Sequence, residues 1–226
     1  MTLWSGLKSL IIPIECVSCG ASNIIICTSC RTQLLDSPEA QPVLLSTRPP
    51  FKLASQLPFN DVVSRIVLGA KDDGNADLER VLVDSLTRTR ALFSSELILI
   101  PIPGTTRARQ ARGRDFLFDV CQSIAKVTGD LVLPILTLGR KVAPQKKLNA
   151  HERLMNMQGA LKIREDLKVK FHDAHPRHEL LLVDDVLTTG ATMREGFRAL
   201  TAGGAWCVGG ISAAYSPNWR RGRLAH

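Results

Sequence analysis

The sequence predicts an α/β fold in which a parallel sheet is covered on both faces, preceded by a small four-cysteine module. Three apolar runs of strand length, at 96–103, 179–185 and 205–215, alternate with segments of helical periodicity. Strands that are separated by helices in this way pair in parallel. Two closely spaced C-x-x-C pairs stand ahead of these elements.

Length and composition set the scale of the molecule. The 226 residues suffice for one good-sized domain plus a small module, and a hydrophobic content of 45% with 22% charged residues is ordinary for a soluble globular protein. No apolar run approaches the roughly 18 to 20 residues that span a bilayer. The opening stretch is short and broken by Pro13, so we expect no signal peptide and a cytoplasmic location.

The basic balance of the chain suggests polyanionic partners. A net charge of +8 fits phosphorylated small molecules or nucleic acid, and it fits equally well a solvated basic surface. Aromatic residues make up 5% of the chain, so no array of platforms for stacking bases is visible. A basic tail carries Arg220, Arg221 and Arg223.

The amino-terminal region divides into three parts. Residues 3–11 place apolar side chains at helical spacing, and Cys16, Cys19, Cys27 and Cys30 follow. Four thiolates in two C-x-x-C turns suit a tetrahedral Zn²⁺ ion, whereas a redox C-x-x-C is the alternative. A stretch rich in Pro and Ser at 36–50 marks a linker, which predicts a module at 1–36 and a domain at 50–226.

The second domain is predicted to alternate helices and strands. Helical periodicity predicts helices over 61–69, 76–92, 115–127 and 193–204, the last closed by Gly203 and Gly204. Pro101 and Pro103 end the first of the three predicted strands. We assign no secondary structure to residues 50–60.

Two adjacent carboxylates, Asp184 and Asp185, end the central apolar run. Neighbouring strand side chains point to opposite faces, so the two can reach two different groups of one ligand. The loop "LTTGATM" then leads into a helix, whose first amides and dipole attract phosphate. Carboxylates for a ribose beside amides for a phosphate predict a ribose-5-phosphate site. The alternative, a helix N-cap in a solvated turn, needs only one Thr or Asp.

The stretch "LLLVDDVLTTGAT" resembles the phosphoribosyl-pyrophosphate (PRPP) motif of type I phosphoribosyltransferases. The resemblance implies that fold, with Asp184 and Asp185 binding the ribose hydroxyls. It also implies that the 5'-phosphate binds to the loop formed by Thr188, Thr189, Gly190, Ala191 and Thr192. The implied reaction displaces pyrophosphate through an oxocarbenium-like transition state, with Mg²⁺ and cationic side chains stabilising the leaving group.

The basic segment "PIPGTTRARQARGRD" resembles the pyrophosphate loop of the same enzymes. It contains Gly104 and four arginines, Arg107, Arg109, Arg112 and Arg114. The Pro-x-Pro stretch with Arg112-Gly113 further resembles the ComF family, proteins linked to DNA uptake in competent bacteria. That family usually continues with Phe-Asn-Gln, whereas this chain has Arg114-Asp115-Phe116.

Residues 140–161 form a second basic segment that also resembles a segment of ComF proteins. The resemblance implies a mobile loop that covers the site. The matching residues are Arg140, Gln145, Leu148, Arg153 and Asn156. Lys71, in "LGAKDDG", and the four cysteines match as well, the latter implying structural Zn²⁺.

These features predict a protein that binds PRPP or a nucleoside monophosphate. We expect Asp184, Asp185, Arg140 and Arg153 to serve catalysis, and Lys71, Gly104, Arg112 and Gln145 to bind phosphate groups. The first hypothesis is phosphoribosyl transfer from Mg²⁺-PRPP to an unknown acceptor. The second is a non-catalytic accessory protein of DNA uptake, acting through single-stranded DNA or a DNA-translocating ATPase.

Overall fold

A computed structural model describes most of the chain: residues 14–36, 43–46, 52–93, 96–143, 148–167 and 179–216, with the backbone alone at 43–46. The predicted helix at 3–11, Gln145 and the basic tail lie outside the described residues. Within the described part, no helix is long and apolar enough to cross a membrane.

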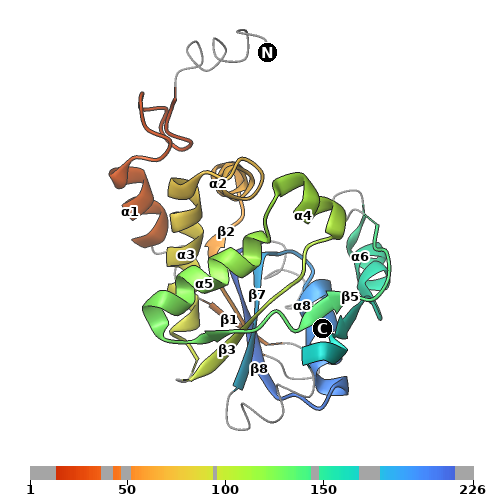
Figure 1. Cartoon of the computed structure of the whole chain (residues 1–226). Helices are drawn as coiled ribbons and strands as arrows, with labels where there is room; N and C mark the ends of the chain where they lie inside the picture. Colours follow the sequence, from red (N-terminus) through yellow and green to blue (C-terminus); the bar gives the residue numbers. More distant parts are fainter. Residues whose placement is uncertain are drawn as a thin grey trace.

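A six-stranded sheet forms the centre of the molecule (Figure 1). Its strands lie in the order β1 (Val43–Ser46), β2 (Lys52–Pro58), β8 (Cys207–Tyr215), β7 (Glu179–Leu187), β3 (Leu97–Pro101) and β4 (Leu131–Val132). All neighbours pair in parallel except β1, which runs antiparallel to β2 at one edge. The predicted α/β class with a parallel sheet is confirmed.

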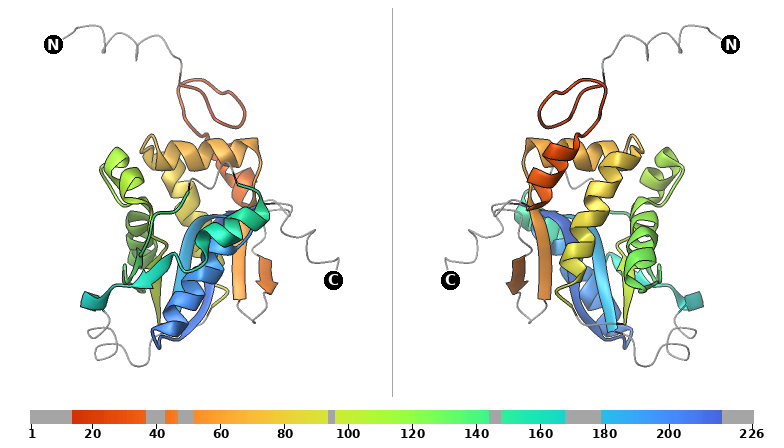
Figure 2. Two further views of the ribbon diagram at one scale, coloured as in Figure 1. Left: turned by 90° about the vertical axis from the view of Figure 1, so that its right-hand side faces the viewer. Right: turned by 90° about the vertical axis from the view of Figure 1, so that its left-hand side faces the viewer.

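Helices cover both faces of this sheet (Figure 2). One face carries α3 (Ala76–Arg90) and α5 (Phe116–Thr128), with α2 (Asp61–Lys71) beside α3. The other face carries α8 (Ala191–Ala202). Because both faces are covered, β3 is buried along its whole length, as a central parallel strand requires.

Two strands at the β1 edge of the sheet were not predicted from the sequence. β1 lies inside the predicted linker, and β2 falls in residues that received no assignment. β2 does not read as an apolar run because Ser55 and Gln56 are polar, yet both side chains are buried. The Gln56 amide donates to the main-chain oxygen of Leu35 at 2.8 Å, which offsets part of its burial.

Between β4 and β7 the chain leaves the main sheet. β5 (Leu136–Leu138) and β6 (Leu161–Ile163) pair antiparallel, and α6 (Ala150–Met157) lies between them in sequence. The amide of Leu161 donates to the buried carboxylate of Glu195 at 3.0 Å, which attaches β6 to α8. α6 begins at a capping box formed by Asn149 and Glu152, a sequence signal that could have predicted it.

The cysteine module packs against α2 and α3 through its loop and through α1 (Thr28–Asp36) (Figure 1). Arg65 of α2 donates to the main-chain oxygen of Val17 through Nε at 3.0 Å and Nη2 at 2.6 Å. Arg31 of α1 pairs with Asp84 of α3. Polar contacts therefore attach the module to the two helices beside the sheet.

Candidate functional site

The topology changes direction at the carboxyl ends of β3 and β7. The chain leaves β3 through α5 to β4 on one side, and it leaves β7 through α8 to β8 on the other. The connections of these two adjacent strands thus diverge, which defines a topological switch point. Ligands of open α/β sheets bind at such a point.

Asp184 and Asp185 lie in β7 at this switch point, three and two residues before the strand ends at Leu187. Asp184 is in register with Ser212 of β8, and Asp185 forms an ion pair with Lys71, the last residue of α2. The amide of Asp185 donates to Oδ1 of Asp184 at 2.9 Å. The structure therefore brings Lys71 to the paired aspartates across 114 positions of sequence.

The environments of the two carboxyl groups differ. Burial and the neighbouring charge of Asp185 raise the pKa of Asp184 well above its ordinary value. Burial also acts to raise the pKa of Asp185, but the Lys71 ammonium outweighs it and the net pKa is lowered. The pKa of Lys71 is raised in turn, because Asp185 and Asp184 outweigh burial. Asp185 and Lys71 are hence charged partners at neutral pH.

The basic segment after β3 folds as a short helix, α4 (Thr106–Arg112), instead of a loop. It has no buried residue and hence no apolar stripe, but Thr105 caps its start and Gly113 its end. Arg112 donates through Nε to Oδ1 of Asp72 at 2.9 Å, beside Lys71. Gly104 is not required sterically, since an added Cβ would meet only the Arg109 side chain at 3.7 Å.

The threonine loop meets α8 at Gly190. Gly190 precedes the helix with a φ of 71°, a left-handed conformation that favours glycine. The hydroxyl of Thr189 accepts from the amide of Ala191 at 3.4 Å, while Thr188 and Thr189 remain partly exposed. The amino terminus of α8 therefore lies a few residues after Asp184 and Asp185, and the helix dipole favours binding of an anion there.

Arg140 and Arg153 belong to the segment between β5 and β6. Arg140 donates through Nη2 to the main-chain oxygens of Asn156 at 3.0 Å and Gln158 at 2.7 Å. The Asn156 amide also bonds both main-chain groups of Ala143. Arg153 is partly buried in α6. Arg140 and Asn156 thus join the two ends of this segment, and these hydrogen bonds all lie within it.

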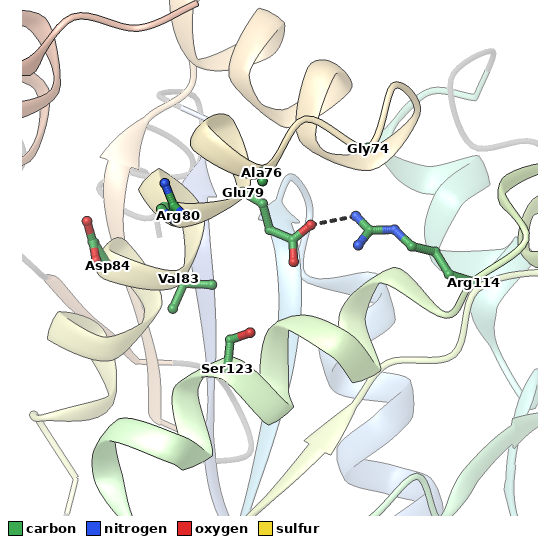
Figure 3. Close-up of a pocket in the computed structure, with 8 residues that line it drawn as sticks. All are labelled: Gly74, Ala76, Glu79, Arg80, Val83, Asp84, Arg114 and Ser123. Carbon is green, nitrogen blue, oxygen red and sulfur yellow. Dashed lines mark hydrogen bonds and ion pairs between the residues drawn. The ribbon is translucent and has the colours of Figure 1, made fainter.

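A cleft of about 320 Å³ lies between α3 and α5 (Figure 3). Its walls include Glu79, Arg80, Asp84 and Arg114. None of the residues assigned from sequence to the ligand site lines it. This cleft is therefore distinct from the candidate site at the switch point.

The four cysteines of the module converge. The Sγ atoms of Cys16, Cys19, Cys27 and Cys30 all lie within 4.8 Å of one another, and no pair is bonded as a disulfide. Cys27 Sγ lies 3.9 Å from Cys16 Sγ and 3.8 Å from Cys19 Sγ. Thiolates around a tetrahedral Zn²⁺ with bonds of about 2.3 Å are about 3.8 Å apart. Amides of Cys27 and Cys30 also donate to neighbouring sulfurs. The donor set fits a structural zinc ion.

The protein is expected to bind zinc through these four thiolates. Protein purified without chelator is expected to contain one Zn²⁺ per chain by elemental analysis, and Cys19→Ser with Cys27→Ser is expected to abolish it. Cys121→Ser, at a buried cysteine outside the module, is the matched control and should retain the metal. Metal-free protein with a reversible Cys16–Cys19 or Cys27–Cys30 disulfide would instead establish the redox alternative.

No protein-family model matches the chain, and no curated protein matches it significantly. Among solved structures, it is similar to an adenine phosphoribosyltransferase with 14% identity and a TM-score of 0.40, covering 84% of this chain and 91% of the other. It is also similar to the adenine phosphoribosyltransferase of Saccharomyces cerevisiae, with 14% identity, a TM-score of 0.39, and 86% of this chain and 92% of the other covered. For the adenine phosphoribosyltransferase of Leishmania tarentolae the identity is 16%, the TM-score is 0.35, and 84% of this chain and 88% of the other are covered. A likeness this limited says nothing about the chemistry at the switch point.

Proposed function

We propose that the chain is a type I phosphoribosyltransferase-like protein that binds Mg²⁺-PRPP at the switch point and transfers its phosphoribosyl group to an acceptor. The observation that carries the proposal is the grouping at one end of the sheet. There the paired aspartates, Lys71 and the glycine-containing loop before α8 lie together. The aspartates suit the ribose hydroxyls, Lys71 balances the charge of Asp185, and the loop suits the 5'-phosphate.

The residues have distinct tasks in this proposal. Asp184 and Asp185 accept from the ribose hydroxyls, and Lys71 keeps Asp185 charged. Backbone amides at the start of α8 hold the 5'-phosphate. Mg²⁺ prefers a few carboxylates, ligand oxygens and water, a donor set that the two aspartates and PRPP together supply. When bound, the ion adds positive charge next to the departing pyrophosphate.

The segment between β5 and β6 supplies the covering element. Arg140 and Asn156 close its base, and β6 is fixed to α8, the helix that begins at the phosphate loop. A cover with a fixed base can exclude water from an oxocarbenium-like centre. Gln145 and Arg153 remain proposed ligand contacts of this cover.

Loss of the carboxylates tests the site. The double change Asp184→Asn with Asp185→Asn is expected to weaken Mg²⁺-PRPP binding by roughly 1 to 3 kcal/mol in titration calorimetry, the range for hydrogen bonds to charged groups. Circular dichroism should remain that of a folded protein. Asp166→Asn, at an exposed aspartate, is the control. Wild-type affinity in the double variant would remove the aspartates from the site.

The finer assignment to ComF proteins, with a zinc module at 1–36 and a domain at 50–226, is supported by the sequence motifs. A non-catalytic role in DNA uptake in the cytoplasm, through single-stranded DNA or a DNA-translocating ATPase, is the alternative proposal. Fluorescence anisotropy with a labelled oligonucleotide tests the DNA partner, whose binding should weaken as salt rises.

A further inference from the structure

Arg114 has contacts that set it apart from the arginines of α4. Its Nη2 donates to the main-chain oxygen of Ala70 at 3.0 Å and to Oε2 of Glu79 at 2.6 Å. Ala70 lies in the last turn of α2, where carbonyl groups lack amide partners further along the helix. Glu79 lies in the first turn of α3. One guanidinium therefore joins the end of α2 to the start of α3.

Phe116 extends this contact to Lys71. The ring is buried, and its centroid lies 5.2 Å from Arg114 Cζ and 6.0 Å from Lys71 Nζ. An aromatic face attracts cations at such distances. Arg114 thus fixes the main chain just before Lys71, and the Phe116 ring faces the ammonium at the outer distance of a cation–π interaction.

Arg112 and Arg114 differ in how firmly they are paired. The side chain of Asp72, which pairs with Arg112, is 47% exposed, whereas that of Glu79, which pairs with Arg114, is 16% exposed. The Arg112 side chain is 19% exposed, so the pair is open to solvent on its Asp72 side, where water or a ligand oxygen can replace the carboxylate. Arg114 also donates to the main-chain oxygen of Ala70. If Arg114 turned toward a ligand, it would lose its contacts with both Glu79 and Ala70.

We propose that Arg114 and Phe116 are positioning residues that hold the Lys71 ammonium against Asp185, and that Arg112 is the arginine that binds the anionic ligand. The ligand part rests on the proposed function. The positioning part depends only on contacts within the protein. It assigns a task to Arg114 and Phe116, where the sequence departs from the ComF pattern.

The cleft in Figure 3 supplies a matched control. Arg114 and Glu79 point toward each other across its wall, and Arg80 lies in the same cleft on α3. Arg80 pairs with Asp77 in an exposed i,i+3 contact, with 65% of its side chain accessible. Arg80→Ala therefore removes a cation from the same wall without touching α2.

The first experiment uses NMR to follow the Lys71 ammonium in protein labelled with ¹⁵N-lysine and free of ligand. The signal of Lys71 is the one that disappears in the Lys71→Arg variant. A held ammonium exchanges its protons slowly with water. Arg114→Ala is expected to accelerate this exchange about tenfold, since local opening becomes easier. Arg114→Lys and Glu79→Gln should show the same direction, and Arg80→Ala no change. Unchanged exchange in the folded Arg114 variants would overturn the positioning role.

The second experiment is a double-mutant cycle on Mg²⁺-PRPP affinity. Arg114→Ala should weaken binding about tenfold in the native background and less than about twofold once Lys71 is methionine, because the two residues then act as one unit. Arg112→Ala should weaken binding in both backgrounds. An equal loss from Arg114→Ala in both would make it a direct ligand and overturn the assignment. A native protein that binds no PRPP would refute the proposed function, and the ammonium exchange would still decide the positioning role.

Discussion

Replacing Asp130 with alanine is expected to lower the free energy of unfolding by about 3 to 5 kcal/mol, the cost of removing one partner of a buried ion pair. The side chains of Asp130 and Arg90 are 1% and 9% exposed. Arg90 donates through Nε and Nη2 to the two carboxylate oxygens at 2.6 and 2.5 Å. Alanine would leave the guanidinium buried without its counter-charge.

The same carboxylate joins three elements. Asp130 follows Gly129 at the end of α5, accepts from the Thr128 hydroxyl at 2.7 Å, and accepts from the amide of Leu97 at 3.3 Å. Arg90 ends α3, and Leu97 begins β3. This ion pair lies at the amino end of β3, opposite the candidate site. The folded fraction of the variant should therefore still bind Mg²⁺-PRPP.

The loss of unfolding free energy caused by Asp130→Ala should depend on pH. Burial acts to raise the pKa of Asp130, but the bonds from Arg90 and Thr128 outweigh it and hold the pKa below its ordinary value. The stabilisation is then complete above about pH 4, the pKa in the unfolded chain, and is lost as pH falls through the lower folded value.

Urea unfolding of the Asp130 variant and the native protein, at neutral pH and below pH 4, measures both effects. The difference between the two proteins should shrink in acid. Arg80→Ala, which breaks an exposed pair, should cost about 1 kcal/mol or less. A comparably small cost for Asp130→Ala at neutral pH would show that the pair contributes little.

Replacing Arg112 with alanine is expected to lower acceptor-dependent pyrophosphate release about 10² to 10³-fold, the usual effect of removing a group that stabilises transition-state charge. Arg112 lies next to Lys71, and its present partner Asp72 is solvent-exposed. As pyrophosphate departs, negative charge grows on its oxygens, so the contact strengthens in the transition state. PRPP affinity should fall less than turnover does.

Pyrophosphate release from Mg²⁺-PRPP, measured across a panel of acceptors, checks this expectation. Arg109→Ala is the matched control, because Arg109 lies on the same short helix with a looser contact to Asp115 at 3.6 Å. Equal losses in turnover and affinity would make Arg112 a ground-state ligand only. Absence of release with every acceptor, with PRPP still bound, would favour the non-catalytic binding protein.

Most of the regular elements could be predicted where one local pattern is strong. The predicted helices at 61–69 and 76–92 correspond to α2 and α3, and the apolar runs correspond to β3, β7 and β8. β2 was missed because its buried Gln56 is compensated by a carbonyl 21 residues away, which no local pattern reveals. α4 was missed because none of its side chains is buried.

The candidate site was only partly predictable. Asp184, Asp185 and the loop to Gly190 follow from residue type and spacing in one continuous stretch. Arg112 was selected by its resemblance to a family motif, and Arg114 received no task from the sequence. The partners of these two arginines, Asp72 for Arg112 and Glu79 for Arg114, lie 40 and 35 residues away in sequence, so no local pattern reveals them. Arg140, predicted as catalytic, donates to main-chain oxygens 16 and 18 residues further on.

By itself, the sequence determined the α/β class, the paired carboxylates before a glycine-containing turn, and the four thiols in two short turns. These features are local, because strand alternation, helix periodicity and turn geometry act over a few residues. Only the tertiary structure decided that Lys71 is the partner of Asp185, that Arg114 braces the end of α2, and that the four sulfurs converge. The path of the chain sets which distant charges meet, and burial sets how strongly they act on one another.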